Sequence, residues 1–337
     1  MMTDFELMMI FLMALPAALF LTVLLCRVII PVLKRHHVGQ HIFADYVQEH
    51  KSKEGTPTMG GICFILPILL LLVPYFIVRA MQGDTTLIPL ALTVCLGVAN
   101  AMIGFADDYT KLLHKENQGF RSWQKFLLQI LVAALYLWGM AAFGGMSTVL
   151  HLESLNICVD LGIWYYVISL IVIVGVVNST NLTDGIDGLA SSVALVASMC
   201  FALIAFMLSD AHSVMISALM IGAMIGFLVF NYHPAKVFMG DTGSLFLGGI
   251  LIGSGFMIGR PWLMVMLCFV FVLDMLSSLI QILSIRLFHR KVFGIAPVHH
   301  QFQKMKWSEE KIVYVFSFFG LIVGAVCVIL VMTSLRV

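Results

Sequence analysis

Five aspartates stand at the ends of strongly apolar segments, where a carboxylate is costly unless it has a function. They are Asp107 and Asp108 in FADDYTK, Asp184 and Asp187 in NLTDGIDGLA, and Asp241 in FMGDTGS. Carboxylates beside glycine-rich turns suit a hard divalent cation such as Mg²⁺, which binds one or two carboxylates together with phosphate oxygens. Because the flanking segments are apolar, we expect this site to lie beside a bilayer and to act on a lipid.

The spacing of the acids indicates different tasks. Asp107 and Asp108 are adjacent, so on a helix they point about 100° apart, and one can face a cavity while the other meets a partner. Asp184 and Asp187 are three residues apart, and they share a face if a helix has begun there. A structural interpretation is open for each motif, either a solvated helix end with an Asp108–Lys111 ion pair or aspartates that cap helices.

Polar residues in the same connections could bind the rest of a substrate. Asn178 and Asn181 offer amide donors and acceptors suited to a sugar or a base. Lys53, in KEGTPTMGG, offers a point charge for a phosphate. The adjacent His299 and His300, in APVHHQF, could contact a diphosphate, orient the water of a metal ion or hydrogen-bond a carboxylate, or could be structural residues of a polar loop.

The composition places these motifs in a membrane protein. The chain has 337 residues, of which 61% are apolar and 11% are charged, and its mean hydropathy is +1.03. Soluble domains carry about 25% charged residues. We therefore expect an all-α polytopic integral membrane protein of about ten transmembrane helices, forming a single transmembrane catalytic domain over residues 1–337. The expected spans are 8–31, 59–78, 87–105, 126–143, 161–178, 188–208, 213–230, 244–259, 262–287 and 312–333.

The distribution of charge predicts the orientation. Lys and Arg concentrate in the connections that follow the odd-numbered spans, and the other connections hold only Arg79, Arg260 and Arg336. Positively charged connections remain in the cytoplasm. We therefore expect both termini outside and the acidic motifs at the cytoplasmic face. The net charge of +1 gives no basic field for nucleic acid, so a nucleic-acid partner is excluded.

Taken in order, GTPTMGG, FADDYTK, NLTDGIDGLA, FMGDTGS and APVHHQF resemble the motif set of the phospho-N-acetylmuramoyl-pentapeptide transferase family, of the polyprenyl-phosphate N-acetylhexosamine-1-phosphate transferase superfamily. The resemblance covers residues 50–307. It implies Mg²⁺-dependent transfer of phospho-MurNAc-pentapeptide from UDP-MurNAc-pentapeptide to undecaprenyl phosphate, a membrane lipid. The implied products are lipid I and UMP, in peptidoglycan synthesis at the bacterial inner (plasma) membrane, and the implied assembly is a homodimer.

The same resemblance implies roles for individual residues. Catalytic residues would be Asp107, Asp108, Asp241, His299 and His300, with Asp241 as the principal Mg²⁺ ligand. Substrate contacts would come from Lys111, Lys125, Asn181, Asp184, Asp187 and, near the uridine, Asn231. Relatives commonly have a third consecutive histidine where this chain has Gln301, so the chain departs from the family motif at this position. Asp107 could act as a base or as a nucleophile, and the sequence does not choose between one displacement and a covalent route.

Two other functions fit parts of the pattern. A sister transferase would keep the aspartates and use UDP-GlcNAc as its donor. A transporter or ion channel would also carry acids in its spans, and Asp274 lies within the run 262–287. A hydrogen bond to a neighbouring helix would explain Asp274 equally well. The clustering of the other acids at one membrane face favours an enzyme.

Overall fold

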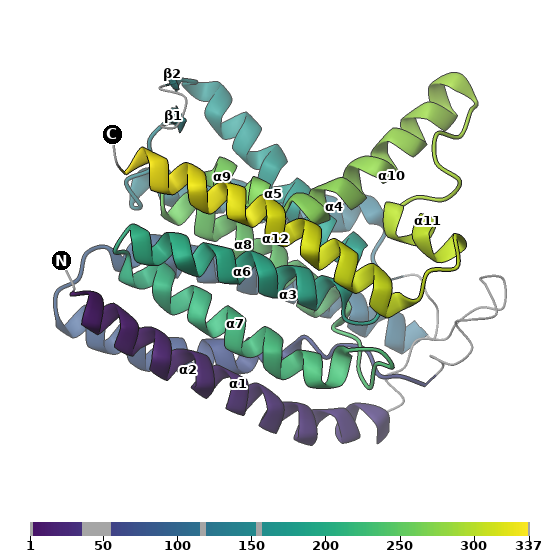
Figure 1. The fold of residues 1–337 in the computed structure, drawn as a ribbon, viewed down its shortest axis with the longest axis horizontal. Helices are drawn as coiled ribbons and strands as arrows, with labels where there is room; N and C mark the ends of the chain where they lie inside the picture. The colour runs from purple at the N-terminus through teal and green to yellow at the C-terminus, as the bar shows by residue number, and fades with distance from the viewer. Residues whose placement is uncertain (1–2, 36–54, 115–118, 153–156, 336–337) are drawn as a thin grey trace.

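A computed structural model describes residues 3–35, 55–114, 119–152 and 157–335, and this part of the chain is almost entirely helical (Figure 1). Twelve helices and one two-stranded ribbon follow one another along the described chain. They are α1 (Asp4–Arg35), α2 (Ile62–Met81), α3 (Leu87–His114), α4 (Ser122–Ala142), β1 (Val149–Leu152), β2 (Ile157–Asp160), α5 (Ile163–Thr183), α6 (Leu189–Met207), α7 (Ala211–Asn231), α8 (Gly240–Met257), α9 (Pro261–Leu267), α10 (Phe269–Phe288), α11 (Val298–Lys304) and α12 (Glu309–Ser334).

The predicted class, an all-α polytopic membrane protein, is confirmed. Nine described helices are long and apolar enough to cross a membrane, namely α1 to α7, α10 and α12. The run at 244–259 forms α8, which is not among these nine. Every α8 residue from Thr242 to Phe256 is buried, because the helix packs against α3 and α5 in the interior. This central helix carries Asp241 in its first turn.

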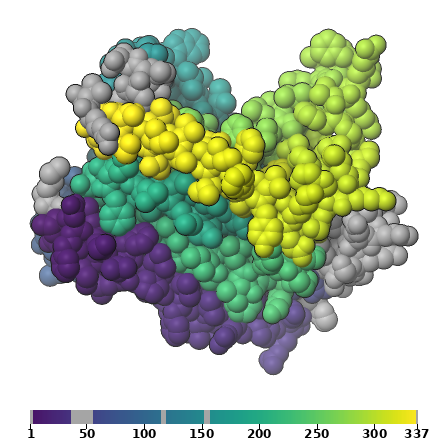
Figure 2. Space-filling view, in the orientation of Figure 1, coloured from purple at the N-terminus to yellow at the C-terminus, as the bar shows by residue number. Residues whose placement is uncertain are grey.

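Two expectations about the elements were wrong in detail. The run at 262–287, expected as one helix, is divided at Cys268 into α9 and α10, and α10 slants away from the other helices as a projection (Figures 1 and 2). All ten expected spans were helices, but β1 and β2 pair as an antiparallel ribbon before α5, with Val149 opposite Asp160. The ribbon is too short for alternation to be recognised, and both faces of β2 are exposed.

The beginning of α1, the end of α12 and the β1–β2 ribbon lie at the same end of the helices (Figure 1). Asp107 lies near the C-terminal end of α3 and Asp241 at the start of α8, at the opposite end. That end also receives α11 and the start of α12 (Figure 1). The acidic motifs therefore lie at the other end of the helices from the start of α1 and the end of α12.

Close backbone contacts hold the start of α8 in place. The backbone N–H groups of Gly60 and Gly61 donate to Phe238 and Met239 at 2.8 and 2.9 Å, so the GTPTMGG motif pairs with the segment before α8. On the other side, a Cβ added at Gly104 of α3 would overlap the backbone carbonyl of Asp241. Helices in membranes approach this closely where small residues face each other. The position of Asp241 is therefore set by backbone packing on two sides.

Candidate active site

Four helices bring a group of charged and polar side chains together around Asp241. Lys111, from α3, places its Nζ 2.7 Å from Asp107 Oδ2 and 3.0 Å from Asp241 Oδ2. Lys125, from α4, places its Nζ 2.7 Å from the same Asp241 oxygen. Asn181, from α5, donates to Asp241 Oδ1 at 2.7 Å and to Ser244 Oγ at 2.9 Å. Residues separated by more than a hundred positions thus meet at one carboxylate.

The surroundings of Asp241 favour its ionised form. Its burial opposes ionisation, but a hydrogen bond with Asp107 and the charges of Lys125 and Lys111 outweigh the burial and hold the pKa of Asp241 well below the usual range. An ionised carboxylate with two ammonium groups on one oxygen is an electrostatic site for a phosphate beside a cation. This is the chemistry that phosphoryl transfer requires of a protein.

Asp107 and Asp108 contact different partners, as their helical spacing predicts. Asp107 accepts from the backbone N–H of Phe120 at 2.7 Å and pairs with Lys111. Asp108 instead accepts from the backbone N–H of Thr242 at 3.0 Å, from its hydroxyl at 2.7 Å and, at 3.3 Å, from the N–H of Asp241. Asp108 therefore caps α8, and a carboxylate there is stabilised by the helix dipole.

The alternative of a solvated helix end does not fit these two residues. Both carboxylates are 4% exposed, and Lys111 lies 4.0 Å from Asp108 but 2.7 Å from Asp107. Asp107 is therefore the carboxylate of the pair that lies nearer the ammonium group of Lys111, while Asp108 fixes the helix that carries Asp241.

Asp184 faces the same region from the turn after α5. Burial raises the pKa of Asp184 well above its ordinary value, and the charges of Asp241, Asp108 and Asp187 raise it further. The backbone N–H of Gly240 acts in the opposite direction. Asp184 is thus a carboxyl group whose ionisation is favoured by an added positive charge.

The donor set suits a hard divalent cation. Carboxylate oxygens of Asp107, Asp108 and Asp241 lie within 4.8 Å of one another. Oxygen donors from one or two carboxylates, completed by substrate phosphate and water, are the usual ligands of Mg²⁺. Asp108 accepts hydrogen bonds from the N–H groups of α8 and Asp107 accepts one from the N–H of Phe120, so Asp241 would be the principal ligand.

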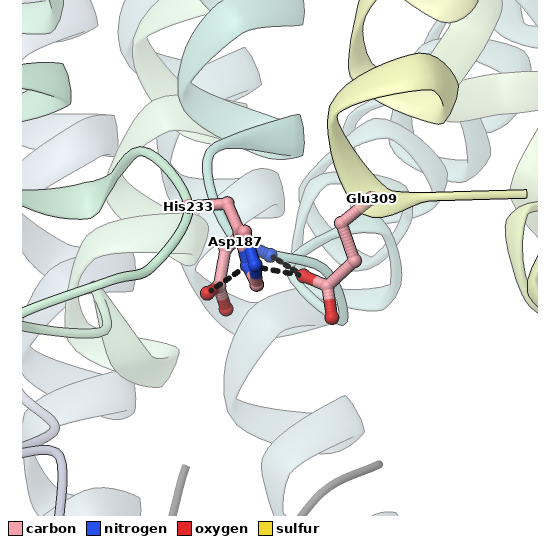
Figure 3. A group of neighbouring side chains, drawn as sticks. All are labelled: Asp187, His233 and Glu309. Atoms are coloured by element: carbon pink, nitrogen blue, oxygen red, sulfur yellow. Dashed lines mark hydrogen bonds and ion pairs between the residues drawn. The ribbon is translucent and has the colours of Figure 1, made fainter. Parts of the chain in front are cut away.

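Asp187 belongs to a second group of side chains, shown in Figure 3. Its Oδ2 lies 3.1 Å from His233 Nδ1 and accepts from the backbone N–H of Ala235 at 3.0 Å. Glu309, at the start of α12, lies 3.6 Å from His233 and accepts from the backbone N–H of Asp187 at 3.1 Å (Figure 3). This group joins the loop after α5, the loop after α7 and α12.

Two predicted contact residues have partners within the protein. Asn178 donates to Gln129 Oε1 at 2.7 Å and to the carbonyl of Val174 at 2.8 Å. Asn231 is buried; it accepts from Ser191 Oγ at 2.7 Å and donates to the carbonyl of Val237 at 3.0 Å. The structure does not bring either amide into the group around Asp241. Lys53, the predicted phosphate contact, lies outside the described residues.

The histidine motif lies on α11, against the turn that carries Asp184. The rings of His299 and His300 are 4.2 Å apart, centroid to centroid, and both face Gly185. His300 Nδ1 lies 2.6 Å from Gln303 Oε1. Gln301, in the place of a third histidine, accepts from the backbone N–H of Ile295 at 2.9 Å and so fixes the loop before α11.

Sequence reasoning missed several residues that build the site. Thr242 and Ser244 were not among the predicted site residues, whereas in the structure Thr242 binds Asp108 and Ser244 binds Asn181. Their hydroxyls beside Asp241 were the available signal. His233 and Glu309 carried no signal, because their contact with Asp187 depends on tertiary structure alone.

Comparisons with known proteins identify the family of the chain. The sequence profile described as glycosyl transferase family 4 matches residues 89–259, and phospho-N-acetylmuramoyl-pentapeptide-transferase signature 1 matches residues 53–65. The phospho-N-acetylmuramoyl-pentapeptide-transferase of Staphylococcus carnosus (strain TM300) is 38% identical over 311 residues, which cover 92% of this chain and 95% of that protein. The proteins of the same name from Staphylococcus aureus (strain bovine RF122 / ET3-1) and Staphylococcus saprophyticus are 39% and 38% identical over 321 and 320 residues, or 94% of this chain and 98% of each relative. The chain belongs to the phospho-N-acetylmuramoyl-pentapeptide-transferase family of membrane glycosyl-1-phosphate transferases.

Proposed function

We propose that this enzyme transfers phospho-MurNAc-pentapeptide from UDP-MurNAc-pentapeptide to undecaprenyl phosphate in a Mg²⁺-dependent reaction that yields lipid I and UMP. The family name supports the transferred group. The observation that supports the chemistry is the meeting of Lys111, Lys125 and Asn181 at the ionised carboxylate of Asp241. Positioning and neutralisation of phosphate charge are the main demands of phosphoryl transfer.

The acidic group would hold the cation. Asp241 would be the principal ligand of Mg²⁺, which when bound polarises the donor diphosphate and stabilises the leaving UMP. Lys111 and Lys125, which pair with Asp241 in this structure, are placed to neutralise phosphate oxygens. Asp107 would deprotonate the lipid phosphate or attack as a nucleophile, and Asp108 would keep Asp241 in position through α8.

We propose further that the site faces the cytoplasm of a bacterial cell at its inner (plasma) membrane, as one catalytic domain. Lys and Arg cluster in the connections at the end of the helices that bears the aspartates, and this bias marks the cytoplasmic side. The homodimer implied by the resemblance is part of the same proposal, and the mass of the purified protein in nanodiscs tests it.

Release of UMP tests the proposed reaction. The purified chain in nanodiscs should release UMP from UDP-MurNAc-pentapeptide only when undecaprenyl phosphate and Mg²⁺ are both present, with no transmembrane gradient. Asp241→Asn should abolish the release, whereas Asp84→Asn, at the opposite end of the helices, should leave it unchanged. Near-normal release by D241N would disprove the role of Asp241. Preference for UDP-GlcNAc as donor would identify the chain as a sister transferase instead.

A further inference from the structure

A carboxylate–histidine pair lies outside the group around Asp241. Asp274 on α10 and His299 on α11 are both 0% exposed, and Asp274 Oδ2 lies 2.7 Å from His299 Nδ1. The other oxygen, Oδ1, accepts from the backbone N–H of His299 at 3.3 Å. An ionised carboxylate only accepts hydrogen bonds, so Nδ1 is the donor in this contact, and an imidazole in the Nδ1–H tautomer has its lone pair on Nε2.

The face of α10 that holds this pair also holds the connection to α11. Ser277 Oγ accepts from the backbone N–H of Val298 at 3.0 Å. One helical turn further on, Gln281 Oε1 accepts from the N–H groups of Val292 and Phe293 at 3.1 and 2.9 Å. Asp274, Ser277 and Gln281 follow the spacing of one helix face. The direction of the His299 ring is therefore set by α10, and not by the loop alone.

His299 Nε2 has no hydrogen-bond partner within the described residues, although it is buried. It faces Gly185, where an added Cβ would lie 2.9 Å from Nε2. Gly185 directly follows Asp184, whose carboxyl group faces the acidic group. An unpaired polar atom in a buried position is destabilising, so its retention needs a reason. A substrate group that completes the hydrogen bond would supply that reason.

We propose that Asp274 is a positioning residue that holds His299 as the Nδ1–H tautomer, with Nε2 directed at the turn after α5. In this position Nε2 accepts a hydrogen bond from an O–H or N–H group of the sugar-nucleotide donor. This inference rests on the proposed function for the identity of the donor. Asp274 touches no substrate and acts through His299. Without Asp274 the imidazole could rotate or change tautomer, and it would then present an N–H to the turn after α5 in place of the Nε2 lone pair. The two residues therefore function together.

Asp274→Asn is the informative substitution. The side-chain amide has one acceptor oxygen in place of two, so either the backbone N–H of His299 or Nδ1 loses its acceptor. If the amide N–H donates to Nδ1, the ring must carry its proton on Nε2. Loss of one neutral hydrogen bond corresponds to about a 3- to 10-fold change in affinity.

The kinetic test is a double-mutant cycle of Asp274→Asn and His299→Asn, followed as UMP release by the full chain in nanodiscs. Each single variant should raise KM for the UDP-linked donor about 3- to 10-fold and leave KM for undecaprenyl phosphate within about twofold. The double variant should be no worse than His299→Asn, because Asp274 then has no ring to position. Asp84→Asn is the matched control, because Asp84 lies 3.4 Å from His212 in a carboxylate–histidine pair at the opposite end of the helices. It should change neither KM.

The ¹⁵N spectrum of histidine-labelled protein tests the arrangement without turnover, with His299→Asn as the reference for assignment. Wild type should show a protonated Nδ1 and an unprotonated Nε2 for His299. Protonation of Nε2 in wild type would overturn the proposal, even if D274N does not fold. Additive effects in the cycle, or equal changes in both KM values, would overturn it as well. If wild type released no UMP from this donor, the proposed function would be wrong, but the spectrum would still test the tautomer of His299.

Discussion

The adjacent aspartates of α3 should fail in different ways when each is replaced by asparagine. Asp108 caps α8 through the N–H groups of Asp241 and Thr242, whereas Asp107 binds Phe120 and Lys111. We expect Asp108→Asn to lower stability and weaken the response to Mg²⁺, because the start of α8 carries Asp241. We expect Asp107→Asn to keep the stability and to lose turnover.

The size of the Asp108 effect follows from its contacts. An asparagine oxygen placed at Oδ2 keeps both bonds from Thr242 and loses the 3.3 Å bond from the N–H of Asp241. That bond contributes about 0.5–1.5 kcal/mol. The charge at the helix N-terminus contributes about 0.3–2 kcal/mol more. The total loss is about 0.8–3.5 kcal/mol. An equal loss of metal affinity would raise half-saturating Mg²⁺ by about tenfold for each 1.4 kcal/mol.

The assay compares thermal unfolding and the Mg²⁺ dependence of UMP release for D107N, D108N and Thr242→Val. The valine variant removes only the hydroxyl that donates to Asp108 at 2.7 Å, so its stability should fall by about 1 kcal/mol, less than that of D108N. Turnover of D107N should fall by about 100-fold or more at any Mg²⁺ concentration. D108N could instead unfold at the wild-type temperature and lose turnover without a shift in half-saturating Mg²⁺. Asp108 would then take part in the reaction directly, and the capping argument would be wrong.

Three further outcomes follow from the same geometry. The pKa of Asp184 is higher in the folded state than in the unfolded state, so ionisation of Asp184 lowers stability. The metal-free protein should therefore melt at lower temperature as the pH rises above the ordinary aspartate range. Asp184→Asn should remove this dependence of the melting temperature on pH. Gly185→Ala should place a methyl group against His299 Nε2 and lower donor affinity at least as much as D274N, measured as KM for the UDP-linked donor. Gly104→Ala should push α3 from the backbone of Asp241 and cost about 1–3 kcal/mol, measured by thermal unfolding, with a matching rise in half-saturating Mg²⁺; unchanged values would show that the contact between α3 and α8 adjusts easily.

The sequence indicated which motifs come together, but not the contacts that they make. Hydropathy identified the membrane class, because apolar runs of about twenty residues have no other stable backbone solution in lipid. The expectation that Asp184 and Asp187 share a helix face required a helix that had begun. In the structure α5 ends at Thr183 and α6 begins at Leu189. The intervening turn lets Asp184 face the start of α8 while Asp187 faces His233.

Contacts that depend on tertiary structure were beyond the sequence. Nothing in NYHPAKVF indicates that the side chain of Asn231 hydrogen-bonds to Ser191 and Val237. The sequence of a polar connection is the same whether its amide side chain binds a substrate or another part of the chain. Asp274 could be recognised as an unusual intramembrane acid, but its partner lies 25 residues further along the chain, beyond a helix end and a loop. A side chain in an apolar run indicates that a partner exists without indicating which one.

Four aspartates of this enzyme share one structural principle. Asp107, Asp108, Asp187 and Asp274 each accept from a backbone N–H of a distant segment, at Phe120, Thr242, Ala235 and His299 respectively. Burial makes an unbonded carboxylate expensive, so each acid in a buried position must be tied to the chain before it can serve a substrate. These hydrogen bonds hold the segments at one end of the helices together. A substitution should therefore abolish turnover without lowering stability only if it keeps the hydrogen bond to the backbone. Asp107→Asn can keep the bond from the N–H of Phe120 and should lose turnover alone, whereas Asp107→Ala cannot keep it and should lose stability as well.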